Sequence, residues 1–249
     1  MPLALVIGSA RENSIAAGVV PRLRADGWQV VTCDLENADY LFDLSTAAGP
    51  AALIEAVTRD EGPISALVLS HAHDVESGVL DTTAESFDHH IVVNARASLL
   101  LIAAFARQIG EAGGAVVALT SDATTGNLPY GASKGALDRI VISAARELGP
   151  MRISANVLNP GPIDTGWMKA LDRSSHPGTC RGASASPPTS QASSLFWSLA
   201  RVVGSRGSCS TQTADSLRGS ESGSMTGCRS VCGHSIWSEL ERFGEVSSC

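Results

Sequence analysis

Residues 120–134 read Thr-Ser-Asp-Ala-Thr-Thr-Gly-Asn-Leu-Pro-Tyr-Gly-Ala-Ser-Lys, and residues 159–165 read Asn-Pro-Gly-Pro-Ile-Asp-Thr. Tyr130 and Lys134 are four residues apart in a helix-like run, which places both side chains on one face of a helix. A free phenol ionises near pH ~10, and an ammonium beside it favours the phenolate, so we expect Lys134 to lower the pKa of Tyr130. Ser121 ends an apolar, strand-like run and can bring a hydroxyl to the same place. Together these groups suit proton exchange with a carbonyl or alcohol oxygen.

Around this stretch, apolar or alternating runs typical of strands take turns with runs of helical spacing. Such alternation predicts an α/β fold with a doubly wound parallel sheet, whose ligand crevice lies beyond the carboxyl ends of the strands. Six strands are predicted, at residues 3–7, 28–33, 40–43, 64–70, 115–120 and 153–158. Helices are predicted between Ser14 and Gly27, over 51–58, over 84–109, and from Tyr130 to about Gly149.

The first strand, glycine, helix and second strand form a candidate mononucleotide-binding unit. Gly8 ends the first strand and Ser14 is a predicted helix N-cap, so the free N–H groups of that helix can hold a pyrophosphate. Asp34 ends the second strand, where a carboxylate can accept from both ribose hydroxyls of NAD and repel the 2′-phosphate of NADP. The alternatives are a glycine that merely ends a buried strand and a solvated turn aspartate.

Ser121, Tyr130-x-x-x-Lys134 and Asn159-Pro160-Gly161, in this order and spacing, resemble the active site of the short-chain dehydrogenase/reductase family. The resemblance covers residues 1–172, about two thirds of the chain, and implies a Rossmann fold. It also implies ketoreductase-like hydride transfer between a nicotinamide and a carbonyl or secondary alcohol. Tyr130 is then the proton donor or acceptor, Lys134 binds the nicotinamide ribose, and Ser121 holds the substrate oxygen.

The resemblance extends to a helix asparagine and to the cofactor site. Asn94 matches the family residue that holds a water relaying protons to the lysine; the alternative is a hydrogen-bonded core asparagine. Ile163 and Thr165 match contacts to the carboxamide, and Asp43 matches an aspartate beside the adenine. The implied cofactor contacts, with NAD expected and NADP less so, are Gly8, Ser14, Ile15, Asp34, Asp43, Leu44, Ser70, Ala72, Tyr130, Lys134, Pro160, Gly161, Ile163 and Thr165.

Two stretches depart from the family's usual pattern. The glycine loop keeps only Gly8, and its Gly8-x5-Ser14-Ile15-Ala16 form is similar to the enoyl reductase branch of the same superfamily. That branch spaces its Tyr and Lys more widely, so the active site favours the carbonyl-reducing branch. Residues 70–73 read Ser-His-Ala-His where the family has Asn-Asn-Ala-Gly, which leaves the usual asparagine contribution near the cofactor in doubt.

Composition narrows the class of partner. The net charge of -7 gives no reason to expect nucleic acid or an acidic membrane surface. No apolar run approaches ~18 residues, so we expect no transmembrane helix and a cytoplasmic location. Small-molecule substrates are expected, and the family is usually homo-oligomeric. The histidines at 71, 73, 89 and 90 have no standard metal spacing, so no metal site is predicted.

The sequence changes character at about Arg173, which predicts a domain at 1–172 and an anomalous tail at 173–249. The last 77 residues hold 20 serines against 12 in the first 172, a composition that favours disorder. Cys228-x-x-x-Cys232-x-His234, with Cys209 as a further ligand, is not a standard zinc pattern.

The tail also has a property that its own reading frame does not explain. Codons built from the third base of one residue and the first two of the next can spell Glu-Gly-Gly-Trp-Ile-Thr-Gly-Gln-Leu-Leu-His-Ser-Asp-Gly-Gly over residues 201–215. This matches the family's last strand, Gly-x-Ile-Thr-Gly-Gln-x-Leu-x-x-Asp-Gly-Gly. We therefore predict a frameshift, a missing seventh parallel strand, an unpaired sixth strand, and an unstable, inactive product.

Two functions remain open. The chain is an oxidoreductase of the short-chain type, or it is a non-catalytic dinucleotide-binding protein or defective enzyme on the same fold. The Tyr130–Lys134 pair favours the first, and the altered loop, the Ser-His-Ala-His segment and the tail favour the second.

Overall fold

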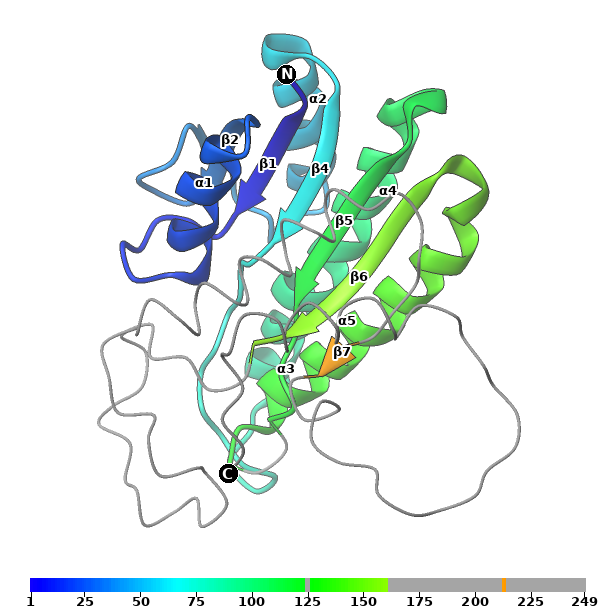
Figure 1. Ribbon diagram of the computed structural model, residues 1–249. Coiled ribbons are helices and arrows are strands. Elements are labelled where there is room, and N and C mark those ends of the chain that lie inside the picture. The colour runs from blue at the N-terminus through cyan, green and yellow to red at the C-terminus, as the bar shows by residue number, and fades with distance from the viewer. Residues whose placement is uncertain (124–125, 161–211, 214–249) are drawn as a thin grey trace, which may run out of the picture. The chain divides into compact units, whose positions relative to one another are not determined.

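The computed structural model describes residues 1–123, 126–160 and 212–213. Their strands form a single sheet in the order β3-β2-β1-β4-β5-β6-β7, and every neighbouring pair is parallel (Figure 1). The described residues belong to the first of two units into which the chain divides, Met1–Ser216. The strands are β1 (Leu3–Ile7), β2 (Gln29–Asp34), β3 (Tyr40–Leu41), β4 (Ile64–Leu69), β5 (Gly114–Leu119), β6 (Ile153–Asn159) and β7 (Gln212–Thr213).

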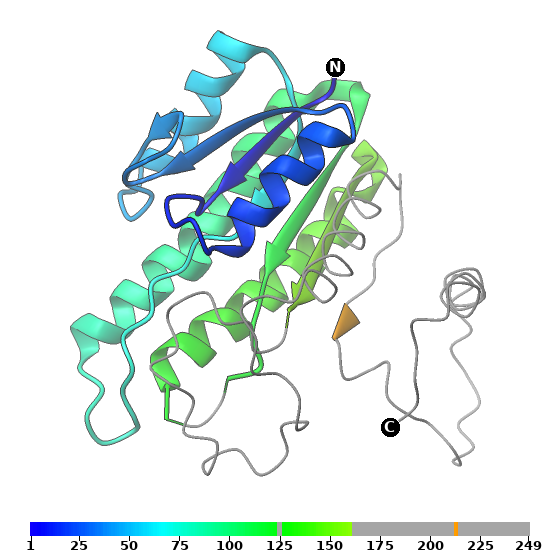
Figure 2. The same ribbon diagram turned by 60° about the vertical axis from the view of Figure 1, so that its left-hand side comes forward.

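The helices cover both faces of the sheet (Figure 2). The first helix packs on one face, and the second, fourth and fifth pack on the other. This arrangement confirms the predicted doubly wound α/β fold, and the order of its first six strands is the one typical of a dinucleotide-binding domain. The helices are α1 (Ile15–Ala25), α2 (Gly49–Glu61), α3 (Ala84–His90), α4 (Ala97–Ile109) and α5 (Leu128–Glu147), with a π-helix at Ile91–Arg96 and 3-10 turns at Gly110–Ala112 and Gly149–Met151.

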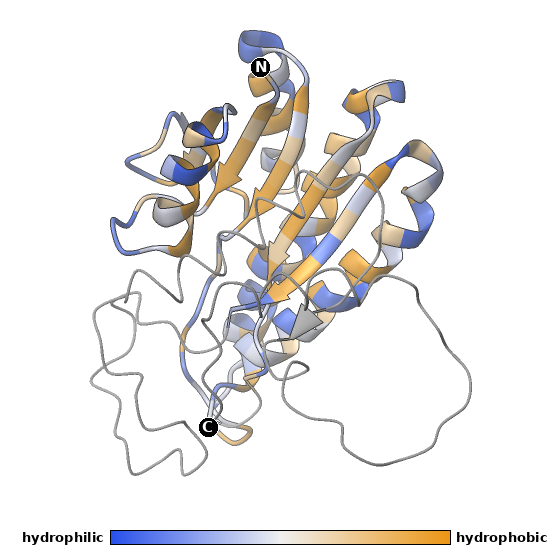
Figure 3. Cartoon of the chain, viewed as in Figure 1, coloured by the Kyte–Doolittle hydropathy of each residue, from blue (hydrophilic) through white to orange (hydrophobic). Residues whose placement is uncertain are grey.

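The continuous apolar run of β1 supplies two separate cores. Leu5 and Ile7 join the core under α2, α4 and α5, whereas Ala4 and Val6 join the core under α1. Successive side chains of a strand point to opposite faces, so a strand covered on both sides must be apolar throughout. The central strands are accordingly hydrophobic along their length (Figure 3). Each fully buried leucine or isoleucine contributes roughly 1.5–3 kcal/mol.

A π-helical turn interrupts the long helix that begins at Ala84 and shifts its apolar stripe. The sequence predicts a regular helix that buries Leu99 along with Ile102 and Phe105. The structure buries Leu101 instead, together with Ile102 and Phe105, and leaves Leu99 48% exposed. The wider turn at Ile91–Arg96 changes the phase of every later residue, so the prediction for Leu99 is wrong.

Residues 84–112 together are long and apolar enough to cross a membrane by composition. More than half of their most apolar stretch is buried, at 56%, and α4 supplies Leu101, Ile102, Phe105 and Ile109 to the sheet core. This run is therefore a core helix of the α/β domain.

The edge of the sheet corrects one prediction from sequence. A seventh strand was expected to be absent, yet Gln212 and Thr213 pair in parallel with Leu158 and Asn159. Backbone N–H and C=O groups suffice for such a pairing whatever the side chains. The paired stretch is two residues long, and within the described ranges Ile153 to Val157 of β6 have no strand on their outer side.

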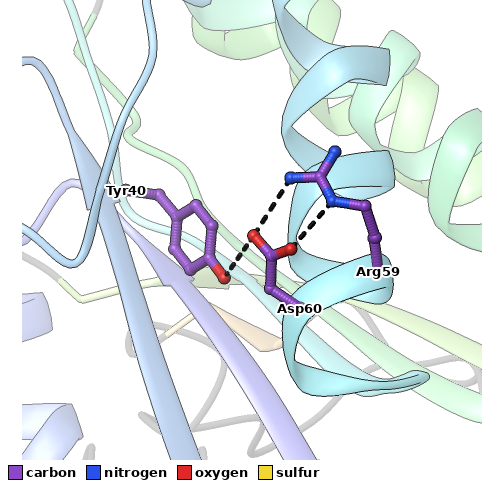
Figure 4. A network of polar contacts seen from close by, with 3 residues as sticks. All are labelled: Tyr40, Arg59 and Asp60. Atoms are coloured by element: carbon purple, nitrogen blue, oxygen red, sulfur yellow. Dashed lines mark hydrogen bonds and ion pairs between the residues drawn. The ribbon is translucent and has the colours of Figure 1, made fainter.

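At the opposite edge, a polar network joins the short strand β3 to α2 (Figure 4). The Tyr40 hydroxyl donates to Asp60 Oδ2 at 3.4 Å, and Arg59 Nε donates to Asp60 Oδ1 at 2.8 Å. This tyrosine therefore has a structural role at the sheet edge.

Candidate active site

Gly8 lies where two chain segments nearly touch at the carboxyl ends of β1 and β4. Its φ is +92°, and its N–H donates to the Cys33 carbonyl at 2.9 Å. A Cβ at this position would lie 2.6 Å from the His71 nitrogen, closer than any side chain can approach. The packing of the two segments thus explains the glycine, and its contact with a cofactor remains a prediction.

The first helix begins as predicted. Ser14 Oγ accepts from the Ala17 N–H at 3.0 Å and caps α1, while Ile15 packs partly buried against the core. The cap uses one N–H of the first turn, and the other N–H groups of a helix start have no partner within the helix. This end of α1 can therefore receive an anionic group.

Asp34 joins the end of β2 to the glycine loop. Its Oδ2 accepts from the Ala10 N–H at 2.8 Å, and its Oδ1 accepts from the Leu35 N–H at 2.8 Å. The alternative of a solvated turn aspartate therefore does not describe Asp34, because its carboxylate holds the loop that follows Gly8. An ionised carboxylate accepts more than two hydrogen bonds, so lone pairs remain for a ribose.

The other expected adenine-side and strand-end positions lie beyond β3 and β4. Asp43 Oδ1 accepts from the Ser45 N–H at 2.8 Å, and the hydrogen bond with the Ser45 side chain, assisted by its N–H, lowers the pKa of Asp43. Leu44 is buried, and the Ser70 N–H donates to the Ile7 carbonyl at 3.0 Å. Ala72 follows in the same segment, partly exposed.

Tyr130 and Lys134 lie on α5 as their spacing predicts. The Lys134 Nζ is 5.6 Å from the centroid of the Tyr130 ring and donates to the Leu119 carbonyl at 2.9 Å. Lys134 is 2% exposed, and burial lowers its pKa from 10.5 to about 8. Ser121 lies two residues beyond the end of β5, and its interaction with the phenol lowers the pKa of Tyr130. The structure therefore brings the three predicted catalytic side chains together.

The expectation that Lys134 lowers the pKa of Tyr130 is wrong for this arrangement. Burial, followed by the negative charge of Asp74, raises the pKa of Tyr130 to about 12. The ammonium of Lys134 is directed to the Leu119 carbonyl and does not offset these effects. The phenol is therefore protonated at neutral pH.

Asn94 is the bridge between three parts of the site. Its Nδ2 donates to the His73 carbonyl at 2.9 Å and to Ser133 Oγ at 2.8 Å, and its Oδ1 accepts from the His73 N–H at 2.7 Å. Ser133 Oγ donates in turn to the Tyr130 carbonyl at 2.7 Å. The side chain is buried, and protein groups take up its hydrogen bonds, so Asn94 is a hydrogen-bonded core asparagine. Its role in a proton relay remains a prediction.

His71, where the family has asparagine, is a neutral residue in this site. Its Nε2 lies 3.2 Å from the Val93 carbonyl, and its Nδ1 is buried without a hydrogen-bond partner among the described residues. Burial, together with the nearby Lys134 charge, lowers the pKa of His71 from 6.5 to about 4. Protonation thus opposes the folded state.

We expect this histidine to make the fold sensitive to acid. The unfolded chain takes up a proton at His71 near its ordinary pKa of 6.5, whereas the folded chain does so only near pH 4. The contribution of neutral His71 to the free energy of unfolding is therefore fully present above about pH 6.5 and is lost as pH falls toward 4. The loss from this one group is at most about 3 kcal/mol. Urea midpoints measured from pH 7 to pH 4.5 should fall less for His71→Asn than for the unchanged chain. His89→Asn, at an exposed position, is the control; equal pH dependence in all three chains contradicts the assignment.

The remaining predicted residues divide into two groups. Pro160 follows β6 at the same end of the sheet, whereas Gly161, Ile163 and Thr165 lie outside the described residues. Within residues 1–123, 126–160 and 212–213, no group of three His, Cys, Asp or Glu side chains is placed to hold a metal ion. The tail's possible ligands, at Cys209, Cys228, Cys232 and His234, also lie outside the described residues.

Sequence reasoning missed two polar residues of this site, Asp74 and Asn127. Asn127 Nδ2 donates to Asp74 Oδ1 at 2.6 Å, although the residues are 53 positions apart. The only signal in the sequence was the place of Asp74 directly after the unusual Ser-His-Ala-His segment.

Comparisons with known proteins agree with this geometry. Residues 8–185 match the model of the family described as Enoyl-(Acyl carrier protein) reductase. The chain is 29% identical over 192 residues to the uncharacterized oxidoreductase YjdA of Bacillus subtilis, across 67% of this chain and 76% of that protein. It is 30% identical over 181 residues to L-xylulose reductase of Homo sapiens, across 67% and 73%.

Among solved structures, a similar fold occurs in a blue fluorescent protein from a metagenomic library in complex with NADPH. The TM-score is 0.60 at 26% identity, and the match covers 66% of this chain and 75% of that chain. Sequence and fold therefore point to the same group of proteins.

Proposed function

Because the chain belongs to the short-chain dehydrogenase/reductase family, an NAD(P)-dependent oxidoreductase family, we propose that it transfers hydride between NAD and a small carbonyl compound or secondary alcohol. The observation that carries the proposal is the meeting of Tyr130, Lys134 and Ser121 at the carboxyl ends of β5 and its neighbours. This is the edge at which doubly wound sheets bind ligands.

The residues present fit a dinucleotide. The start of α1 offers N–H groups and a positive helix end to a pyrophosphate, and Asp34 offers carboxylate lone pairs to a ribose. Lys134, buried beside Tyr130, is proposed to bind the nicotinamide ribose, with Asp43, Leu44, Ser70, Ala72 and Pro160 lining the remainder of the cofactor site. A bound nicotinamide supplies or accepts the hydride.

The side chains of the site handle the proton. Tyr130 is protonated at neutral pH and can donate to a carbonyl oxygen that gains negative charge, which suits reduction. The Ser121 hydroxyl holds the same oxygen. Lys134 keeps a positive charge below about pH 8 and is proposed to bind the nicotinamide ribose rather than to lower the pKa of Tyr130. Asn94 would complete the proton relay that returns a proton to Tyr130 after each transfer.

Turnover of NADH or NADPH with a panel of ketones, and of NAD or NADP with alcohols, tests the proposal. Dinucleotide binding without turnover across the panel would instead support the alternative, a non-catalytic dinucleotide-binding protein on the same fold. The observation that favours this alternative is His71, which replaces the family's asparagine and is neutral and incompletely hydrogen-bonded. A cytoplasmic location is part of the proposal. The family is usually homo-oligomeric, but without a full last strand this chain is not expected to assemble in that way.

Asp34 should make NAD(H) the preferred cofactor. A 2′-phosphate placed beside this carboxylate meets like charge, which costs enough to lower NADP(H) affinity by about tenfold or more. Dissociation constants of the two cofactors, measured by fluorescence titration, should converge in Asp34→Asn. Glu36→Gln removes the same charge at an exposed position nearby and should leave the preference unchanged. Tighter binding of NADP(H) by the unchanged chain would show that Asp34 does not face the ribose.

We further propose that residues from about Arg173 onward are encoded out of frame. The support is the shifted reading of residues 201–215, which restores the family's last strand, and the open outer side of β6 from Ile153 to Val157 within the described ranges. The domain boundary at 172 and 173 follows from this proposal.

A further inference from the structure

Asp74 lies in the segment after β4, between two residues whose backbone is fixed. On one side, both backbone groups of His73 bond to Asn94, at 2.7 and 2.9 Å. On the other side, the Val75 N–H donates to His90 Nε2 at 3.0 Å. The fold therefore sets the position of the carboxylate, in the manner expected of a preorganised group.

The same segment is attached to the start of α5. Asn127, the residue before the helix, donates from Nδ2 to Asp74 Oδ1 at 2.6 Å, and the Leu128 N–H donates to the Ser77 carbonyl at 2.9 Å. Tyr130 lies in the first turn of this helix. Within the part of the chain that the structure describes, no cationic side chain forms an ion pair with Asp74.

The charge of Asp74 reaches both members of the catalytic pair. After burial, Asp74 is the next cause that raises the pKa of Tyr130. Burial lowers the pKa of Lys134, whereas Asp138 and then Asp74 raise it. Two histidines lie in the same segment of the chain: His71, which is neutral and is influenced by the Lys134 charge, and His73, whose pKa is lowered by burial and raised by Asp74. Asp74 is thus a negative charge near enough to influence both residues, and its carboxylate is bonded to the residue that precedes their helix.

A second acceptor accompanies this carboxylate. Asn127 donates through Nδ2, but its Oδ1 is buried and has no hydrogen-bond partner among the residues described. A buried polar atom without a partner is costly and calls for a donor. Carboxylate and amide oxygens accept hydrogen bonds and offer nothing to an anion.

We propose that Asp74 is a further residue of the site, which selects carbonyl compounds that carry a hydroxyl or ammonium group beside the carbonyl and disfavours those that carry a carboxylate there. A hydroxyl or ammonium donates to the fixed acceptors, whereas a carboxylate meets like charge. The inference rests on the proposed function, because the carbonyl is the group that Tyr130 protonates.

The first test does not require turnover. The chain has two tyrosines, so in a Tyr40→Phe background Tyr130 is the only phenol, and its ionisation can be followed by ultraviolet absorbance after a rapid pH jump. Asp74→Asn should lower the phenol pKa by about half to one unit, and Asp74→Glu should retain most of the original value. Glu76→Gln removes a charge at an exposed position two residues away and should change nothing. A phenol pKa that does not move in Asp74→Asn overturns the proposal.

The second test reads selectivity with hydroxyacetone, aminoacetone and pyruvate, which differ in the group beside the carbonyl. The unchanged chain should favour the first two in kcat/KM, and Asp74→Asn should reduce their advantage over pyruvate by about tenfold or more. An equal ratio in both chains overturns the selection. If no compound is turned over, the proposed function fails, and calorimetric binding of the same compounds in the presence of NADH decides this inference; equal binding preferences in both chains overturn it.

Discussion

Replacement of Tyr130 by phenylalanine is expected to lower kcat by ~10²–10⁴-fold and to leave cofactor affinity almost unchanged. The substitution removes one hydroxyl, the proton donor, and keeps the ring that lies 5.6 Å from the Lys134 ammonium. Tyr130 is protonated at neutral pH because its pKa is raised to about 12, and the Lys134 ammonium already donates to the Leu119 carbonyl. The measurements are single-turnover hydride transfer and NADH binding by fluorescence.

Tyr40→Phe is the matched control for this experiment. It removes the same hydroxyl from the other tyrosine, which lies at the far edge of the sheet and bonds to Asp60. This control should cost a little stability and no turnover. Near-normal activity of Tyr130→Phe would remove Tyr130 from the proposed mechanism, and a large loss of cofactor affinity would assign it to binding instead.

Restoring the reading frame is expected to have the largest effect on the whole protein. Adding one base between the codons for Trp167 and Pro188 should give a chain that is more soluble, unfolds more cooperatively and turns over substrate faster, whereas the present chain should aggregate more readily, melt earlier and be far less active. The physical reason is the edge of the sheet: β6 pairs on its outer side at Leu158 and Asn159 alone within the described ranges. A longer last strand would satisfy the remaining backbone groups and remove an open edge.

The control is the same one-base addition placed after the codon for Asp215, which leaves residues 201–215 unchanged and should restore nothing. Expression yield, thermal unfolding and turnover are compared for the three chains. The frameshift proposal fails if the present chain purifies as a stable, active oligomer, or if the nucleotide sequence in the shifted frame does not encode the missing strand.

The sequence alone predicted the order of strands and helices and the end of the sheet at which the site lies. Buried strands such as β1 are apolar throughout and end at glycine or a polar residue, so their boundaries can be read locally. The four-residue spacing of Tyr130 and Lys134 likewise fixes their common helix face without any knowledge of the rest of the chain. These features depend on the period of the backbone, which neighbouring residues determine.

Other features depend on contacts between segments distant in sequence. The π-helical turn at Ile91–Arg96 moved the apolar stripe and exposed Leu99, and an isolated pattern of helical spacing contains no sign of such a turn. The two-residue pairing of Gln212 and Thr213 with β6 is made by backbone groups, so the pattern of side chains in the sequence did not predict it.

The chemistry of the catalytic pair was also decided by the tertiary structure. From the sequence, the ammonium of Lys134 should lower the pKa of Tyr130; in the fold, that ammonium donates to the Leu119 carbonyl, and burial and Asp74 raise the pKa of the phenol. Asp74 reaches the site through its bond with Asn127, 53 residues further along the chain. Sequence determined which groups meet on α5, but a pKa depends on burial and on every nearby charge, and only the packed fold brings these together.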